Sequence, residues 1–159
     1  MRRFAAVGVY GFNGHTFFDA LHAAAVDMVL DVRARRGVRG REYAWANSAR
    51  LQDALTENGI GYRHYPELAP TTELRQLQYR EDAEQGVGKR SRVRLAEEYR
   101  QRYTAEILDQ VDLALLVNRL PETCTCALLC VELDPQACHR SIIAGRVETI
   151  GVPVTHLRP

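Results

Sequence analysis

Short apolar runs alternate with helical segments along almost the whole chain, and this alternation constrains the fold more than any other feature. The runs that predict strands lie near residues 5–10, 28–32, 61–65, 126–131 and 153–157. Between them, apolar residues recur at helical spacing, for example over residues 16–25 and 139–150. We therefore expect a three-layer α/β sandwich with a mainly parallel sheet of about five strands, forming one domain over residues 1–159.

Local signals predict the helices and loops between the strands. Thr16 and Asp19 form a variant of the capping box, which indicates a helix N-terminus at Thr16. Residues 33–46 predict a long polar loop, and residues 70–90 predict a short helix flanked by loops. Over residues 91–115 an apolar side chain recurs at every fourth position, which predicts one long helix.

Composition excludes several classes of protein. The chain has 159 residues, of which 46% are hydrophobic and 26% are charged, so it suits a domain with an apolar core and not a disordered chain. No apolar run approaches the ~20 residues that a membrane helix needs, and no apolar leader follows the basic first residues. We therefore expect a cytoplasmic protein with no membrane partner and with reduced cysteines.

Basic residues are concentrated in two segments, although the net charge of the chain is only +1. Residues 33–50 contain six arginines and one glutamate, and residues 89–102 contain one lysine and five arginines against two glutamates. Two such segments either focus a positive field on an anionic ligand or form two solvated faces. Arginine also offers a bidentate recognition of phosphate or carboxylate that lysine cannot.

The strongest candidate site is the loop that joins the strand ending near residue 131 to the helix beginning near residue 139. Free backbone N–H groups at a helix N-terminus bind anions, and the helix dipole lowers the pKa of a nearby thiol. The candidate catalytic residues are Cys130, Glu132, Cys138 and His139, and the candidate ligand-binding residues of this segment are Arg140 and Ser141.

Each of these residues also has a structural interpretation. Cys130 can be a small apolar residue of the core, and Cys138 can be inert. Arg140 can pair with Glu132 or Asp134 on the same loop. These alternatives stay open at the level of sequence.

A second candidate element is Asp31-Val32-Arg33, at the end of the second expected strand. Asp31 and Arg33 can bind a ligand there, or they can satisfy loop amides and surface charges. Ligands of parallel sheets bind at the carboxyl ends of the strands. We therefore expect this element to lie on a strand adjacent to the one that ends at Cys130, at the same edge of the sheet.

Other known motifs are missing. The chain has no phosphate-binding loop ending in Gly-Lys-Ser/Thr, no dinucleotide fingerprint and no His-Glu-x-x-His helix. The cysteines at 124, 126, 130 and 138 do not have the spacing of a zinc finger or ribbon. We therefore expect neither a metal nor a cofactor.

Both candidate elements resemble motifs of the domain-of-unknown-function family 488. Its members typically show a strand ending in Asp-Val-Arg, here Asp31–Arg33, and a late Cys-x-Glu-x-x-Pro-x-x-Cys-His-Arg motif, here Cys130–Arg140. The order of elements matches over nearly the whole chain. The first turn, Gly8–Gly11, lacks the family's His-Ser, and Leu68–Pro70 stands where Leu-Gly-Gly is common. The resemblance implies a Rossmann-like α/β fold and a site built from Arg33, Cys130, Glu132, Cys138, His139 and Arg140.

The leading functional expectation is a small enzyme or ligand-binding domain for a phosphate-bearing ligand, such as a nucleotide or a nucleic-acid end. Arg33 and Arg140 would clamp the anion. His139 or Glu132 would act as general acid or base, because a histidine titrates near neutral pH.

One alternative is a thiol-based sulfur-transfer enzyme that uses either loop cysteine. The other is a nucleic-acid-binding module without catalysis, in which the basic segments and their aromatic neighbours contact single strands. Those aromatic neighbours are Tyr43, Trp45, Tyr99 and Tyr103.

Overall fold

A five-stranded, all-parallel sheet forms the centre of the molecule, with the strand order β3-β2-β4-β1-β5. The computed structural model describes all residues 1–159. The strands are β1 (Arg3–Gly8), β2 (Met28–Asp31), β3 (Gly61–His64), β4 (Thr125–Cys130) and β5 (Val154–His156). This architecture confirms the α/β sandwich with a mainly parallel sheet that the sequence predicts.

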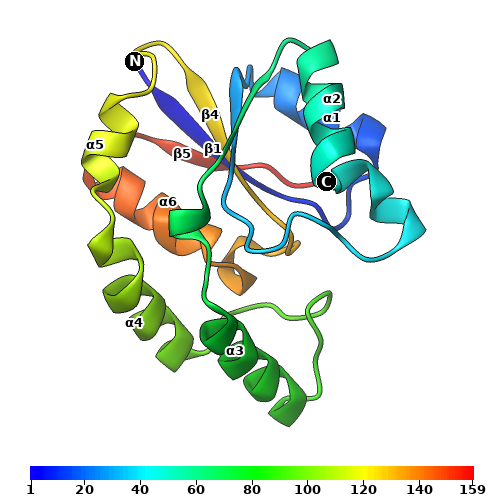
Figure 1. Cartoon of the computed structure of the whole chain (residues 1–159), viewed down its shortest axis with the longest axis vertical. Coiled ribbons are helices and arrows are strands. Elements are labelled where there is room, and N and C mark those ends of the chain that lie inside the picture. The colour runs from blue at the N-terminus through cyan, green and yellow to red at the C-terminus, as the bar shows by residue number, and fades with distance from the viewer.

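Helices cover both faces of the sheet (Figure 1). The helices are α1 (Gly14–Ala23), α2 (Ser48–Glu57), α3 (Thr72–Glu84), α4 (Glu97–Glu106), α5 (Leu113–Asn118) and α6 (Arg140–Thr149). The first two pack on one face through apolar residues such as Phe17 and Leu51, and the other four contribute to the core on the opposite face. None of these helices combines the length and the apolar content needed to cross a bilayer.

The central strand β4 explains why the core has two halves. All six of its residues are buried, because the strand is covered on both faces and flanked by β1 and β2. Its alternate residues Leu128 and Cys130 belong to the core under α3–α6, whereas Ala127 and Leu129 belong to the core under α1 and α2. A continuous apolar run is the usual sequence of such a doubly covered strand.

The region expected to form one long helix over residues 91–115 is instead broken. Helix α4 ends at Glu106, a short 3-10 turn spans Leu108–Gln110, and α5 begins at Leu113. A spacing of four residues rotates the apolar face by about 40° at each step, so a straight helix would turn it away from the core. The break turns only part of the apolar series back toward the core, because Leu115 at the end of the series remains 46% exposed.

Three other expectations need smaller corrections. Asn13, and not Thr16, is the N-cap of α1, and the two residues form a reciprocal capping box with Thr16 at the third helical position. The polar loop after β2 contains a 3-10 helix over Arg41–Ala46, because its aromatic side chains pack against the core. Helix α3 spans 13 residues and is longer than the short helix expected between 70 and 90.

Candidate functional site

The carboxyl ends of β2 and β4 lie side by side and form the base of the site. The two strands pair in parallel, with Asp31 opposite Leu129. The chain after β2 and the loop after β4 therefore leave the sheet at the same edge, as the sequence predicts. His139 connects them directly, because its Nε2 lies 2.8 Å from the backbone oxygen of Val32.

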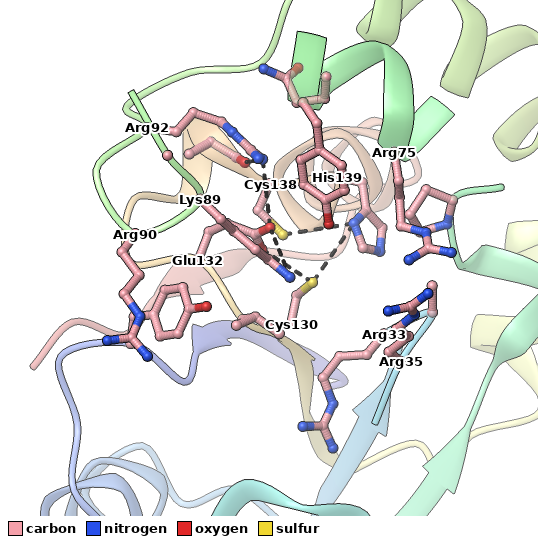
Figure 2. A pocket seen from close by; sticks show the side chains of 18 of the residues that line it. Arg33, Arg35, Arg75, Lys89, Arg90, Arg92, Cys130, Glu132, Cys138 and His139 are labelled. Atoms are coloured by element: carbon pink, nitrogen blue, oxygen red, sulfur yellow. Dashed lines mark hydrogen bonds and ion pairs between the residues drawn. The ribbon is translucent and has the colours of Figure 1, made fainter. Parts of the chain in front are cut away.

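A cleft of about 640 Å³ opens above this edge. Its walls come from the segment after β2, from α3, from the segment between α3 and α4, and from the loop after β4. Seven basic residues and one acidic residue line it. The basic residues are Arg39 and six that Figure 2 labels, and the acidic residue is Glu132. The six labelled basic residues are Arg33, Arg35, Arg75, Lys89, Arg90 and Arg92.

The floor of the cleft holds the four residues that the sequence predicts as catalytic. Cys130 is the last residue of β4, and Cys138 and His139 immediately precede α6. In Figure 2 both sulfur atoms face the ring of His139, and each Sγ lies 3.8 Å from its Nδ1. Glu132 Oε2 lies 3.5 Å from the Cys130 sulfur. All four residues are at least nine-tenths buried, yet each contributes to the lining of the cleft.

The hydrogen bond to Val32 fixes the tautomer of His139. A backbone carbonyl can only accept, so Nε2 carries the proton and donates it to Val32 O. The lone pair of Nδ1 in the neutral ring therefore faces the two cysteine sulfur atoms. The ring of Tyr103 packs against the imidazole, with 5.4 Å between the ring centroids.

The two thiols have opposite shifts in pKa. Burial raises the pKa of Cys130 well above its ordinary value, and the neighbouring Cys138 raises it further. Burial alone would also raise the pKa of Cys138. The neighbouring Cys130 thiol and the positive charges of Arg140 and His139 outweigh that effect and hold the Cys138 pKa well below its ordinary value. The pair therefore favours a thiolate at Cys138 beside a neutral thiol at Cys130.

Glu132 lies between the thiols and the basic wall. Its Oε1 is 3.9 Å from Lys89 Nζ and 3.6 Å from an Arg92 nitrogen. Burial raises the pKa of Glu132, and the negative charge at Cys138 adds to that shift, whereas Lys89 opposes it. The pKa of His139 is also raised, because the Cys138 thiolate stabilises the imidazolium more than burial disfavours it.

Neither Arg33 nor Arg140 is placed as an anion clamp, because Arg33 is paired inside the protein and Arg140, although its Nε has no hydrogen-bond partner, does not line the cleft. Arg33 is 1% exposed and donates to both carboxylate oxygens of Asp31, at 2.9 and 2.8 Å, and to Ala46 O at 2.8 Å. Arg140 is fully buried and donates to the backbone oxygens of Glu132, at 2.7 Å, and Leu133, at 3.3 Å. The structure therefore does not support the expected clamp, because both groups hold protein atoms in place.

The other two expected ligand-binding residues also have structural partners. Asp31 is fully buried and accepts from Tyr62 Oη at 2.6 Å in addition to Arg33. Ser141 donates its hydroxyl to Cys138 O at 2.9 Å. Neither residue lines the cleft. Arg140 bonds to the backbone of the loop, and not to the carboxylates of Glu132 or Asp134 that the sequence suggested as partners.

The cationic residues that do line the cleft come mainly from the two basic segments. Segments 33–50 and 89–102 meet where Arg90 pairs with Glu42 at 3.2 Å and stacks over the rings of Tyr10 and Tyr43. The concentration of basic residues in the two segments was the sequence signal for the cationic lining, although it did not show which arginines face the cleft. Arg75 on α3 lies outside both segments, and no feature of the sequence marked it.

The aromatic residues next to the basic segments are internal. Tyr99 and Tyr103 are 3% and 0% exposed and belong to the core under α3–α6. Tyr43 and Trp45 are half-buried and pack against Tyr10 and Phe17. These rings are therefore not exposed platforms for the bases of a single strand.

One family model matches the chain: that of the domain of unknown function DUF488, over residues 14–147. The match includes the strand end at Asp31–Arg33 and the whole loop from Cys130 to Arg140. No curated protein and no solved structure matches the chain.

Proposed function

The chain belongs to the DUF488 family, and we propose that its cleft binds a phosphate-bearing ligand and acts on it with the groups of the floor. A nucleotide or the end of a nucleic-acid strand has the required chemistry. The observation that carries this proposal is the basic lining of the cleft, in which four of the seven basic residues pair with carboxylates and three have none. Clefts lined by one sign of charge concentrate ligands of the opposite sign.

Three of these basic side chains have no protein carboxylate as a partner. Arg35 and Arg39 are exposed and form no side-chain hydrogen bond, and Arg75 bonds only to the hydroxyl of Thr72 at 3.0 Å. Arg75 Nε is buried without any hydrogen-bond partner. A buried donor of this kind costs about 1–3 kcal/mol if it stays unpaired, so an oxygen of a bound anion would stabilise it. Guanidinium groups suit this role because they bind phosphate oxygens in pairs.

The size of the cleft and the chemistry of its floor favour an enzyme over a passive binding protein. A volume of about 640 Å³ is large enough for a nucleotide-sized ligand. Buried thiols, an imidazole and a carboxylate with shifted pKa values are more typical of reactive sites than of simple anion traps. Binding to long single strands is less well supported, because the neighbouring aromatic rings are internal.

Calorimetric titration tests the anion site. We expect inorganic phosphate and adenosine monophosphate to bind the protein and adenosine to bind much more weakly. Arg75→Ala and Arg35→Ala should each weaken the binding of adenosine monophosphate about tenfold or more, because each removes a charged hydrogen-bond donor. Arg50→Ala is the matched control, since Arg50 is exposed in the same basic segment as Arg35 but does not line the cleft.

We therefore expect the affinity for adenosine monophosphate to fall in the Arg35 and Arg75 variants but not in the Arg50 variant. Equal affinity for adenosine and adenosine monophosphate would contradict the proposal. An equal loss of affinity in Arg50→Ala and Arg75→Ala would also contradict it, because binding would then depend on overall charge and not on the cleft.

A further inference from the structure

We propose that Cys130, Cys138 and His139 bind one zinc-like divalent ion on the floor of the cleft, with a fourth coordination position open to the cleft. The spacing of the cysteines in the sequence gave no reason to expect a metal. The inference goes beyond the proposed anion site, because the ion would bind in the absence of any phosphate-bearing ligand.

The distances between the three ligand atoms are close to those of a tetrahedral zinc site. Cys130 Sγ, Cys138 Sγ and His139 Nδ1 are all within 4.8 Å of one another, and each sulfur is 3.8 Å from the nitrogen. With Zn–S and Zn–N bonds of about 2.3 and 2.0 Å, a tetrahedral ion places sulfur and nitrogen about 3.5 Å apart and two sulfurs about 3.8 Å apart. Movements of about 1 Å or less in the side chains would therefore complete the site.

The imidazole is held in the tautomer that a metal needs. Its Nε2–H donates to Val32 O, which belongs to the rigid end of the neighbouring strand, and Nδ1 is left as an acceptor that faces both sulfur atoms. A histidine that ligates a metal usually donates its second ring N–H to a backbone carbonyl or a carboxylate in this way. The Arg140 backbone N–H lies 3.5 Å from Cys138 Sγ, where it can support a thiolate ligand.

Charge balance makes a cation compatible with the basic walls. Two thiolate ligands neutralise a divalent ion, and the Glu132 carboxylate lies 3.5 Å from the Cys130 sulfur on the side of Lys89 and Arg92. The bound ion would therefore add no net positive charge beneath the arginines. Three protein ligands with one open position is the arrangement of catalytic zinc sites, in which the open position holds water or substrate.

The second cysteine pair in the chain provides an internal control. Cys124 and Cys126 lie near the opposite end of β4, and their sulfur atoms are 3.0 Å apart. Both are buried and reduced, as the cleft cysteines are. They belong to no group of metal-ligating side chains, because no histidine or acidic side chain joins them.

Cobalt(II) reports directly on this site, because thiolate ligation gives charge-transfer absorption and four-coordinate geometry gives intense visible bands. Protein purified in the presence of a chelator and a reductant, then dialysed, is titrated with Co²⁺ alone and afterwards with Zn²⁺. We expect one Co²⁺ per chain, both kinds of band, and displacement by Zn²⁺. Cys130→Ser, Cys138→Ser and His139→Gln should each weaken binding about a hundredfold or more. Cys124→Ser and Cys126→Ser should bind as the wild type does.

A second measurement uses only the wild type, so its result does not depend on whether the variants fold. Zn²⁺ should slow alkylation of Cys130 and Cys138, located by mass spectrometry, and leave alkylation of Cys124 and Cys126 unchanged. Absence of the charge-transfer band, loss of the band in Cys126→Ser, or alkylation of Cys130 and Cys138 at equal rates with and without Zn²⁺ would overturn the proposal. The last result would identify the pair as free thiols. Since no phosphate is present, these outcomes are independent of the titrations with adenosine monophosphate.

Discussion

At the scale of single residues, Arg140 supports the candidate site by holding the backbone of the loop after β4. Its guanidinium binds the backbone oxygens of Glu132 and Leu133, and it is fully buried next to Gly8. These bonds fix the loop that carries Glu132 toward the cleft. A residue that looks like an anion ligand in the sequence therefore has a structural role here.

Arg140→Ala should accordingly destabilise the protein by about 2–4 kcal/mol, because it leaves buried carbonyl oxygens without partners and removes a large buried side chain. Chemical denaturation measures this change. Arg146→Ala is the control, since Arg146 is about one-third exposed in a surface pair with Asp109, and its loss should cost less than about 1 kcal/mol. Equal stability of Arg140→Ala and the wild type would show that the guanidinium does not hold the loop.

Gly8 makes the close approach of this loop possible. A Cβ atom at Gly8 would overlap the backbone oxygen of Glu132 and lie 3.1 Å from Arg140 Nη1. Gly8→Ala should therefore displace the loop and destabilise the fold by about 1–3 kcal/mol. Gly145→Ala on α6 meets no atom within 4 Å and should be neutral or stabilising. Denaturation midpoints that do not distinguish the two variants would contradict this view.

At the scale of elements, Arg92 joins the walls of the cleft to the loop after β4 through a buried ion pair and a hydrogen bond. Arg92 donates to the Asp82 carboxylate of α3, with one nitrogen at 2.7 Å, and to Ala137 O at 3.1 Å. Nearby, Gln78 of α3 accepts from the backbone N–H of Ala96 at 2.8 Å. These contacts hold the segment that carries Lys89 and Arg90 against the loop after β4.

Asp82→Asn should loosen this wall, because it removes the closest charge partner of the buried Arg92 and leaves only the longer contact with Glu132. We expect a loss of about 3 kcal/mol in the free energy of unfolding, together with weaker binding of adenosine monophosphate. Asp109→Asn makes the same chemical change in the exposed pair with Arg146 and should alter neither quantity by more than a small amount. If Asp82→Asn binds adenosine monophosphate with wild-type affinity, the wall does not depend on this pair.

Two buried tyrosines of helix α4 should make the stability of the fold decrease at alkaline pH. Burial raises the pKa of Tyr99 and of Tyr103 well above the ordinary value of 10.0, so the fold holds both phenols neutral. This contribution to stability is complete below pH ~10 and is lost as the pH rises further, because the unfolded chain then ionises more readily. Tyr99→Phe should make the alkaline loss of stability shallower than in the wild type. Urea denaturation between about pH 8 and 11 compares the two slopes, and equal slopes for Tyr99→Phe and the wild type would contradict the assignment.

At the scale of the whole molecule, the sequence predicts the sheet better than the use of its side chains. The strands could be found because β-strand runs are local patterns, and the shared edge of β2 and β4 follows from parallel-sheet geometry. The structural roles of Arg33 and Arg140 could not be predicted, because their burial depends on hydrogen-bond partners such as Ala46 and Leu133 that only folding brings near. Arg75 was missed for a similar reason, since one arginine on a polar helix has no pattern of its own.

Phosphate binding by the unpaired arginines of the cleft above β2 and β4 can be observed in a crystal structure of the protein with adenosine monophosphate. We predict a phosphate group within hydrogen-bond distance of Arg75 Nε and of Arg35 or Lys89, directly above the floor formed by Cys130 and His139. An empty cleft at saturating ligand, or a phosphate bound only outside these residues, would contradict the proposed binding.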